Sequence, residues 1–172
     1  YLGAGGFNAR SYAENFGGTL AEAVGYCPAR GVQVHVTVNT IVMDHEMDEL
    51  SRTVEEVAES GADAAIIQDL AVLAQFRDRC PDIKRHASTQ MTIHDLDGAK
   101  AAADMGFHRV VLSRELTLRE IEHICTHCGI ETEVFVHGAL CMCMSGVCYL
   151  SAILGGRSGD RGLCAQPCRL DF

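Results

Sequence analysis

The chain has 172 residues and a formal net charge of −9, a length typical of about one globular domain. Hydrophobic residues make up 48% and charged residues 22%, which excludes a disordered or collagen-like chain. The acidic balance argues against a broadly basic nucleic-acid-binding surface, although a local basic groove remains compatible with it. Apolar runs fall far short of the roughly 20 residues of a membrane helix, so we expect no membrane span. Because the chain begins at Tyr1 without a secretory signal, we expect a piece of a longer cytoplasmic protein.

Alternating and apolar segments predict strands. In the clearest of them, Gln33–Asn39, Val34, Val36 and Val38 alternate with polar residues, the period of a half-buried strand. In the last, Val134 and Val136 are expected to face helices. The predicted strands cover residues 33–39, 64–69, 85–90, 109–114 and 133–138, and Tyr1–Gly3 would end an earlier strand.

Helical patterns separate these strands, because apolar residues recur three and four positions apart. One stripe contains Leu50, Val54 and Val57, and Gly61 is expected to end that helix. The expected helix starts are the N-cap Asp44 and the capping boxes Thr19–Glu22 and Thr117–Glu120.

Strands that alternate with helices predict parallel pairing through right-handed crossovers. The fold class is therefore α/β, and two architectures fit: a doubly wound open sheet or part of a (β/α)8 barrel. Central strands of a doubly wound sheet are apolar on both faces, whereas these strands keep one polar face, as barrel strands do. We therefore expect an incomplete (β/α)8 TIM-barrel-like parallel sheet over residues 1–140, followed by a Cys-rich C-terminal extension, residues 141–172, of the same domain.

The polar faces of the strands predict a site at their carboxyl ends, where barrel enzymes place their active sites. The candidate substrate-binding residues are Asn39, Gln68, Ser88, Gln90, Arg114 and His137. The candidate catalytic residues are Gln90, Arg114, Glu133 and His137. The alternative is that these side chains are satisfied interior polar groups that serve packing specificity.

The cysteines carry the strongest chemical signal. The sequence contains nine, and Cys141, Cys148 and Cys164 have the spacing C-x6-C-x15-C in a glycine-rich region that also holds Cys143 and Cys168. Thiolate ligands select zinc or iron–sulfur clusters. Paired zinc knuckles are absent, so the spacing favours an iron–sulfur cluster over zinc, with free thiols as the alternative. The remaining cysteines, Cys27, Cys80, Cys125 and Cys128, continue apolar helical stripes and are expected to be core residues.

The segment from Glu133 to Ser151 resembles the signature of peptidase family U32. The matching residues are Glu133, Phe135, Gly138, Ala139, Leu140, Cys141, Gly146, Cys148, Leu150 and Ser151. Similar segments occur along the rest of the chain: Tyr1–Gly3, Phe7–Arg10 with Asn15-Phe16, His86–Met91 and Gly162–Arg169. The segments His-Ala-Ser-Thr-Gln and Cys-Ala-Gln-Pro-Cys-Arg are most similar to the branch that hydroxylates ribosomal RNA.

The resemblance implies one of three functions. Family members form 5-hydroxyuridine in tRNA or 5-hydroxycytidine in ribosomal RNA without molecular oxygen, or hydroxylate ubiquinone precursors, and prephenate is implicated as the small-molecule oxygen donor. An RNA-modifying hydroxylase, with rRNA or tRNA as partner, is therefore expected first. The first alternative is a collagenase-like peptidase of unknown catalytic type, which the family name implies. The second is an accessory subunit, since some members work as heterodimers. A homodimer is also compatible with the resemblance.

The resemblance also implies a 4Fe–4S cluster on four cysteines in the intact protein. By position, three of the ligands would be Cys141, Cys148 and Cys164. The fourth is expected beyond Phe172, with Cys168 as a substitute within this sequence. Arg157, Arg161 and Arg169 form the local basic cluster beside these cysteines.

Overall fold

The computed structural model describes residues 1–11, 20–139 and 141–170. Its strands form one parallel sheet whose spatial order, β1-β2-β3-β4-β5-β6, is the order of the chain. A doubly wound sheet reverses its strand order at a switch point, so this order is that of successive β/α units of a barrel. The predicted α/β fold class, an incomplete barrel-type sheet, is confirmed. The strands are β1 Leu2–Gly3, β2 His35–Val38, β3 Ala64–Ile67, β4 Lys84–Ala87, β5 Arg109–Val111 and β6 Glu131–Glu133.

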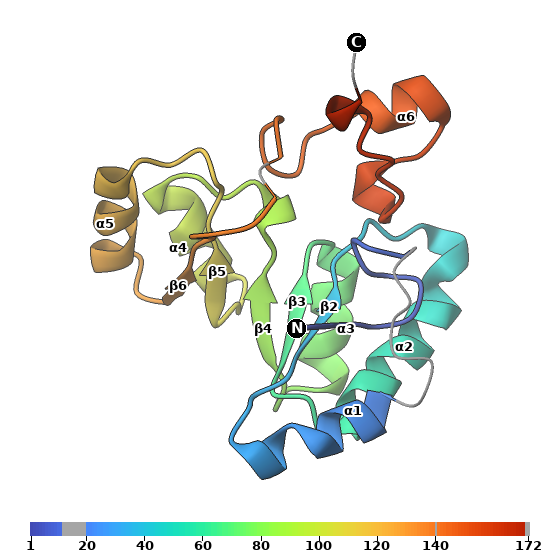
Figure 1. Ribbon diagram of the computed structural model, residues 1–172. Helices are drawn as coiled ribbons and strands as arrows, with labels where there is room; N and C mark the ends of the chain where they lie inside the picture. The colour runs from blue at the N-terminus through green and yellow to red at the C-terminus, as the bar shows by residue number, and fades with distance from the viewer. Residues whose placement is uncertain (12–19, 140, 171–172) are drawn as a thin grey trace.

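The helices lie outside the strands, and residues 141–170 lie past the strands' carboxyl ends (Figure 1). No helix among the described residues is long and apolar enough to cross a membrane. The helices are α1 Leu20–Tyr26, α2 Met47–Ser60, α3 Leu70–Arg79, α4 Leu96–Asp104, α5 Leu118–His127 and α6 Leu150–Gly155.

The core lies between the sheet and the helices. Val34, Val36 and Val38 are buried, as the alternation of this strand predicts, and α2 packs Leu50 and Val54 against the same core. The polar residues of β2 therefore face the opposite, inner side of the sheet. The polar side chains that belong to the candidate site therefore lie on the inner face of the sheet.

The last strand is shorter and earlier than predicted. β6 ends at Glu133, and Val134 and Val136 are 36% and 91% exposed instead of packed on helices. The pairing of Arg109 with Glu131 sets the register, and the last ladder bond runs from the Leu112 N–H to the Glu133 carbonyl. Beyond this point β5 has no residue left to pair, so the segment after Glu133 leaves the sheet.

Other element boundaries also differ from the sequence prediction. β2 covers only residues 35–38 of the predicted 33–39, β3 ends at Ile67 instead of residue 69, and β5 ends at Val111 instead of residue 114. Asp44 begins a 3-10 turn, Asp44–Glu46, and α2 starts only at Met47, so Asp44 is not its N-cap. The predicted strand 85–90 ends at Ala87, because the Ser88 side chain accepts a hydrogen bond from the Gln90 N–H and starts the 3-10 turn Thr89–Met91. Gly61 ends α2 as expected, with a left-handed φ of 79°.

Helix capping is confirmed at one of the two predicted boxes. Thr117 and Glu120 form a reciprocal capping box at the start of α5. The other box needs Thr19, which lies outside the described residues.

The expected core cysteines behave differently from one another. Cys128 is buried, and Cys27 and Cys80 pack against the core while partly exposed. Cys125 is exposed, so its placement in the core was wrong. Its sulfur contacts the Thr132 hydroxyl of β6 at 2.9 Å, and since β6 is the edge strand of the described sheet, no further strand covers this thiol.

The buried side of α3 generates a stability prediction. Phe76 has no exposed surface, so Phe76→Ala should lower the free energy of unfolding by about 3–5 kcal/mol through lost burial and a cavity. Leu118→Ala is the control, because Leu118 is 85% exposed and its truncation should have little effect. Urea unfolding of both variants measures the difference, and equal losses would contradict the buried placement of α3.

Candidate active site

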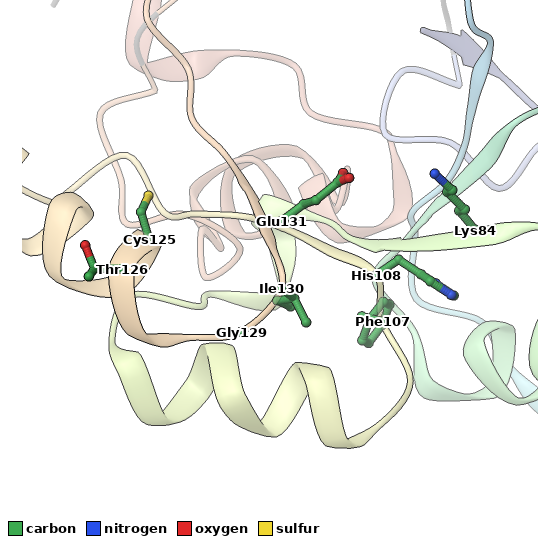
Figure 2. Close-up of a pocket in the computed structure, with 8 residues that line it drawn as sticks. All are labelled: Lys84, Phe107, His108, Cys125, Thr126, Gly129, Ile130 and Glu131. Carbon is green, nitrogen blue, oxygen red and sulfur yellow. The ribbon is translucent and has the colours of Figure 1, made fainter.

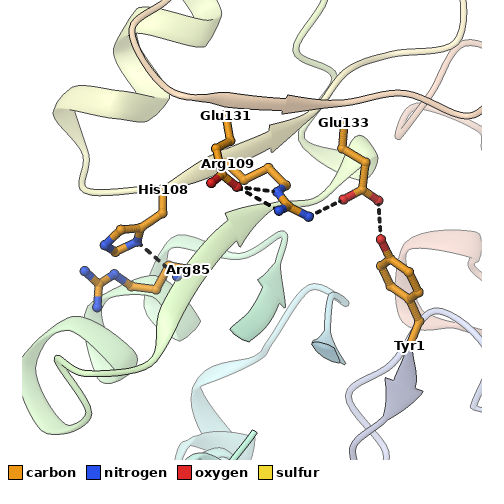
Figure 3. Close-up of polar contacts among 6 residues, drawn as sticks. All are labelled: Tyr1, Arg85, His108, Arg109, Glu131 and Glu133. Carbon is orange, nitrogen blue, oxygen red and sulfur yellow. Dashed lines mark hydrogen bonds and ion pairs between the residues drawn. The ribbon is translucent and has the colours of Figure 1, made fainter. Parts of the chain in front are cut away.

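An ion-pair network joins the ends of the sheet across its inner face. The Arg109 guanidinium donates to Glu131 at 2.7 Å and to Glu133 at 2.9 Å. The Tyr1 hydroxyl, just before β1, donates to the other oxygen of Glu133 at 2.8 Å (Figure 3). Side chains from the first and last strands therefore meet, so the sheet is curved as a barrel wall is. The two carboxylates outnumber the one guanidinium, so this group as a whole carries a net negative charge.

His86 lies in the middle of this inner face and is 1% exposed. Its ring meets that of His35 edge-on, with centroids 4.9 Å apart. Burial, followed by the positive charge of Arg109, lowers the pKa of His86 to about 4, so the ring is neutral at physiological pH. Neither ring nitrogen has a hydrogen-bond partner among the described residues.

Three of the predicted site residues form one hydrogen-bonded group at the carboxyl ends of β2 and β4. The Asn39 side-chain amide donates to the Ser88 hydroxyl at 3.3 Å, and the Gln90 N–H donates to the same oxygen at 3.3 Å. Asn39 also accepts from the Ala9 N–H at 3.0 Å. The structure therefore brings these residues together at the strand ends, through the side chains of Asn39 and Ser88 and the backbone N–H of Gln90, and their substrate-binding role stays a prediction.

Gln68, at the end of β3, contacts a residue that the sequence prediction missed. Its side chain hydrogen bonds the carboxyl group of Asp160, which is buried. Burial raises the pKa of Asp160 above its usual range, and the hydrogen bond from Gln68 partly offsets this rise. The pattern Gly159-Asp160-Arg161-Gly162, a charged pair between glycines, is the signal in the sequence that marks this turn.

Arg114 joins the end of β5 to the cysteine segment. Its Nε donates to the hydroxyl of Ser145 at 3.1 Å, and Ser145 donates in turn to Glu115 at 3.2 Å. Ser145 is 1% exposed and was not among the sequence candidates. The Arg114 guanidinium also contacts the Cys141 thiol. Arg114 therefore links the strand end to a cysteine, which strand alternation alone does not predict.

Glu133 and His137 are not part of this group. Glu133 is held on the inner face by Arg109 and Tyr1, as described above. His137 is exposed in the segment after β6, because that segment is not a strand and does not direct alternate side chains inward. Their catalytic roles stay predictions that this geometry does not strengthen.

The extension docks on the strand ends at a first point, Ser145-Gly146. The Ser145 N–H donates to Glu115 at 3.0 Å, and its carbonyl accepts from the Thr92 hydroxyl at 2.8 Å. A Cβ on Gly146 would lie 2.2 Å from the Gln90 carbonyl oxygen, and its φ is 79°. Only glycine fits this contact, so the turn that carries Cys141 and Cys148 lies directly on the turn after β4.

A second docking point lies at Asp160–Gly162. Arg161 forms an ion pair with Glu46 and donates to the Ile41 carbonyl at 2.6 Å. A Cβ on Gly162 would lie 2.2 Å from the Asn8 carbonyl oxygen. Arg161 therefore makes an internal contact. Of the predicted basic cluster Arg157, Arg161 and Arg169, it is the member that is least available to bind RNA.

The cysteines of the extension gather without forming a complete ligand set. Burial alone would raise the pKa of Cys141, but the Cys143 N–H and the guanidinium groups of Arg114 and Arg169 outweigh it and lower that pKa. Burial and contact with Cys148 raise the pKa of Cys143.

Cys164 approaches from the other side of Gly159. A Cβ at Gly159 would be 3.8 Å from both the Cys148 carbonyl oxygen and the Cys164 Cβ. Within the described part of the chain, no three His, Cys, Asp or Glu side chains are arranged as ligands of one metal ion. The donor chemistry suits a soft metal centre, and the ligand assignment of Cys141, Cys148 and Cys164 stays a prediction.

A hollow lies at the opposite, amino ends of β4–β6. Figure 2 shows Lys84, His108 and Glu131 at its rim, with Cys125 beside it. Barrel enzymes do not place catalysis at this end, so we assign no site here.

The structure thus combines a barrel-type sheet, polar residues at the carboxyl ends of its strands, and a cysteine-rich extension that docks on those ends. Residues 1–172 match the model of peptidase family U32, and the chain belongs to that family. It is 41% identical over 172 residues to the 23S rRNA 5-hydroxycytidine C2501 synthase of Escherichia coli (strain K12), covering all of this chain and 26% of the relative.

Other relatives carry different names. The chain is 31% identical over 173 residues to tRNA hydroxylation protein P1 of Bacillus subtilis (strain 168), covering 100% of the chain and 41% of that relative. It is also 31% identical over 188 residues to a collagenase of Porphyromonas gingivalis, covering 100% of the chain and 44% of that relative. The chain therefore spans less than half the length of each of these relatives. The solved structure of the U32 peptidase Mk0906 has a TM-score of 0.58 at 14% identity, covers 67% of this chain and 50% of its own, and supports the fold.

The close approach of Gly146 generates a test of the first docking point. Gly146→Ala should displace the cysteine turn from β4, because the added methyl group clashes with a backbone carbonyl and the residue has a left-handed φ. Alkylation of Cys143 and Cys148 by iodoacetamide should then be faster. Gly155→Ala is the matched control, since nothing lies within 4 Å of its Cβ. Unchanged alkylation in Gly146→Ala would contradict the docking.

The second docking point should depend on pH. The hydrogen bond from Arg161 lowers the pKa of Glu46 from 4.5 to about 2. A lowered carboxyl pKa stabilises the folded state above the unfolded pKa, and this stability is lost as the pH falls toward about 2. Glu46→Gln should therefore lower Tm at pH 7, and the difference from wild type should shrink progressively below pH 4.5.

Glu56→Gln, an exposed change on α2, the helix that follows Glu46, should leave Tm nearly unchanged at every pH. A Tm difference for Glu46→Gln that is the same at pH 3 and pH 7 would refute the ion-pair explanation.

Proposed function

We propose that the chain is part of an enzyme that hydroxylates a pyrimidine base of RNA at C5, forming 5-hydroxycytidine or 5-hydroxyuridine. The observation that carries the proposal is the 41% identity, along the whole chain, to an rRNA 5-hydroxycytidine synthase. The polar inner face and strand ends described above supply hydrogen-bonding groups where a barrel enzyme holds its substrate. The reaction replaces the C5–H bond of the base by C5–OH, which is a two-electron oxidation. The oxygen atom would come from a small-molecule donor such as prephenate, whose C–O bond breaks and which is reduced by the same two electrons, and the C5 hydrogen would leave as a proton.

The proposal includes a 4Fe–4S cluster in the intact protein. Cys141, Cys148 and Cys164 would be three ligands, and the fourth would come from outside these residues or from Cys168. The fit is supported by the lowered pKa of Cys141, because thiolates are the ligands of such clusters. When bound, a cluster supplies electron transfer or a binding site for the oxygen donor.

Residues of this chain would have different roles in the reaction, according to where they lie in the site. Asn39, Ser88 and Gln90 form the hydrogen-bonded group at the strand ends and would orient the base. Arg114, anchored by Ser145 and directed at Cys141, provides positive charge beside the cysteines for an anionic donor. His86 is neutral and buried below them, so it would offer a hydrogen bond and no charge.

A peptidase is the second candidate, because relatives include a protein named collagenase and an uncharacterized protease of Methanocaldococcus jannaschii that is 34% identical over 175 residues. Nucleophilic hydrolysis needs a hydroxyl or thiol beside a general base. In the described ranges, no hydrogen bond joins a histidine ring to a serine or cysteine side chain. The Ser145 hydroxyl does donate to the Glu115 carboxylate, but Ser145 is 1% exposed and also holds Arg114, so this pair offers no accessible nucleophile. This geometry favours the hydroxylase, and an accessory role in a heterodimer remains the third candidate.

Metal content and RNA modification test the proposal together. The intact parent protein, purified without oxygen, should contain about four irons per chain with matching acid-labile sulfide. Cys141→Ala and Cys148→Ala should abolish both the iron and the hydroxylated nucleoside, measured by mass spectrometry of RNA from a host that depends on this protein.

Cys125→Ala is the control for these variants, because that thiol is exposed on α5 away from the extension. It should keep the iron and the nucleoside. A metal-free protein that digests gelatin and leaves every hydroxylated nucleoside unchanged would establish the peptidase instead.

A further inference from the structure

Buried side-chain polar atoms without a partner gather in one region of the described chain. They are Gln68 Oε1, Gln90 Oε1, Ser113 Oγ and both ring nitrogens of His86. These residues lie on or directly after β3, β4 and β5, three neighbouring strands. Folded proteins pair nearly all such atoms, because a buried polar atom without a partner has lost its hydrogen bonds to water and gained none in return. Their concentration on the inner side of three strand ends points to a ligand that supplies the missing partners.

Asp160 adds a buried carboxyl group to this region. It is 8% exposed, and no cation forms an ion pair with it among the described residues. A buried carboxylate without a cation is costly unless hydrogen-bond donors surround it. The docked turn at Gly162 and the hydrogen bond from the Ile41 N–H to the Asp160 carbonyl hold the residue beside the segments that follow β1 and β2, and its carboxyl group reaches Gln68 at the end of β3.

The contact between Asp160 and Gln68 sets the direction of the Gln68 amide. A carboxylate only accepts hydrogen bonds, so the NH2 group of Gln68 points toward Asp160. The Gln68 oxygen is therefore the atom that remains, and it has no donor. Gln68 and Asp160 together present side-chain oxygen atoms that accept hydrogen bonds. A ligand group with more than one N–H donor would pair with both.

We propose that Asp160 and Gln68 form an acceptor-lined subsite that binds the exocyclic amino group of a cytosine base. The proposal rests on the RNA-hydroxylase function above and narrows its substrate to cytidine. The 4-amino group of cytosine has two N–H donors, one for each acceptor. A base taken out of its stack is read by such contacts to its Watson–Crick edge.

Uracil is the natural competitor, and the same subsite disfavours it. Uracil has a carbonyl oxygen where cytosine has the amino group, so an acceptor would face two further acceptors. The carbon hydroxylated in the reaction, C5, is bonded to the carbon that bears the amino group. Holding that group at Asp160 and Gln68 therefore also fixes the position of C5 at the strand ends.

The test compares the binding of two RNA oligonucleotides to the intact parent protein. One is single-stranded oligouridine with a single cytidine, and the other is oligouridine throughout, because uracil carries no exocyclic amino group that could compete for the subsite. Fluorescence anisotropy should show at least about tenfold tighter binding of the cytidine oligonucleotide. Gln68→Met, which removes the acceptor, should reduce this ratio severalfold. Asp160→Asn, which adds a donor for a carbonyl oxygen, should move the preference toward uridine.

Matched controls separate specificity from general damage. Gln75→Met and Asp78→Asn make the same chemical changes on α3, where Gln75 contacts Ser51 and Asp78 contacts Arg77. Both controls should keep the wild-type ratio. If Asp160→Asn does not fold, judged by its thermal melt, Gln68→Met alone carries the test.

The outcomes distinguish this inference from the proposed function. Equal binding of the two oligonucleotides by wild type, or an unchanged ratio in Gln68→Met and Asp160→Asn, overturns the subsite. Nucleoside mass spectrometry of RNA from the host provides the other arm: if wild type binds cytidine preferentially but forms no hydroxylated nucleoside, the hydroxylase function fails and the subsite stands. If 5-hydroxyuridine forms and 5-hydroxycytidine does not, the cytosine assignment is wrong and the hydroxylase function stands.

Discussion

Contact between the cysteine-rich extension and the carboxyl ends of the strands is the interaction on which the site depends. At Gly146 and Gly162 the two backbones approach so closely that a methyl group would lie 2.2 Å from a carbonyl oxygen. The ion pair between Arg161 and Glu46 reinforces the second contact. Because the extension is held at both places, Asp160 is buried against the polar strand ends, and the cysteines, which are exposed or partly exposed, stay beside those ends.

Charge is distributed unevenly between the inner face and its mouth. On the inner face, the positive charge of Arg109 is more than balanced by Glu131 and Glu133, and His86 is uncharged, so no positive charge is left over. At the mouth, Arg114 contacts Cys141 and polarises the cysteine segment. The interior therefore suits a neutral ligand recognised by hydrogen bonds, whereas the mouth suits anionic or electron-rich groups. A nucleobase and an anionic oxygen donor would meet between these two environments.

The sequence predicted what depends on local periodicity. The alternation around Val36, the stripe through Leu50 and the capping box at Thr117 all appear in the structure. The end of the last strand was missed, because it depends on where β5 stops pairing and not on the apolar residues Val134 and Val136. Ser145 and Asp160 were missed for a similar reason: their environments arise only when the extension folds back on distant strand ends.

The hydrogen bond between Tyr1 and Glu133 has a consequence for synthesis of the chain. Its partners are separated by 132 residues, so the ribosome makes one long before the other. Until β6 emerges, Arg109 lacks both of its carboxylate partners, and the turns after β1 and β2 wait still longer for Gly162 and Arg161. During translation, polar groups of the early strands therefore stay unpaired until the later segments are made. In this period chaperones or other proteins can bind the exposed strands.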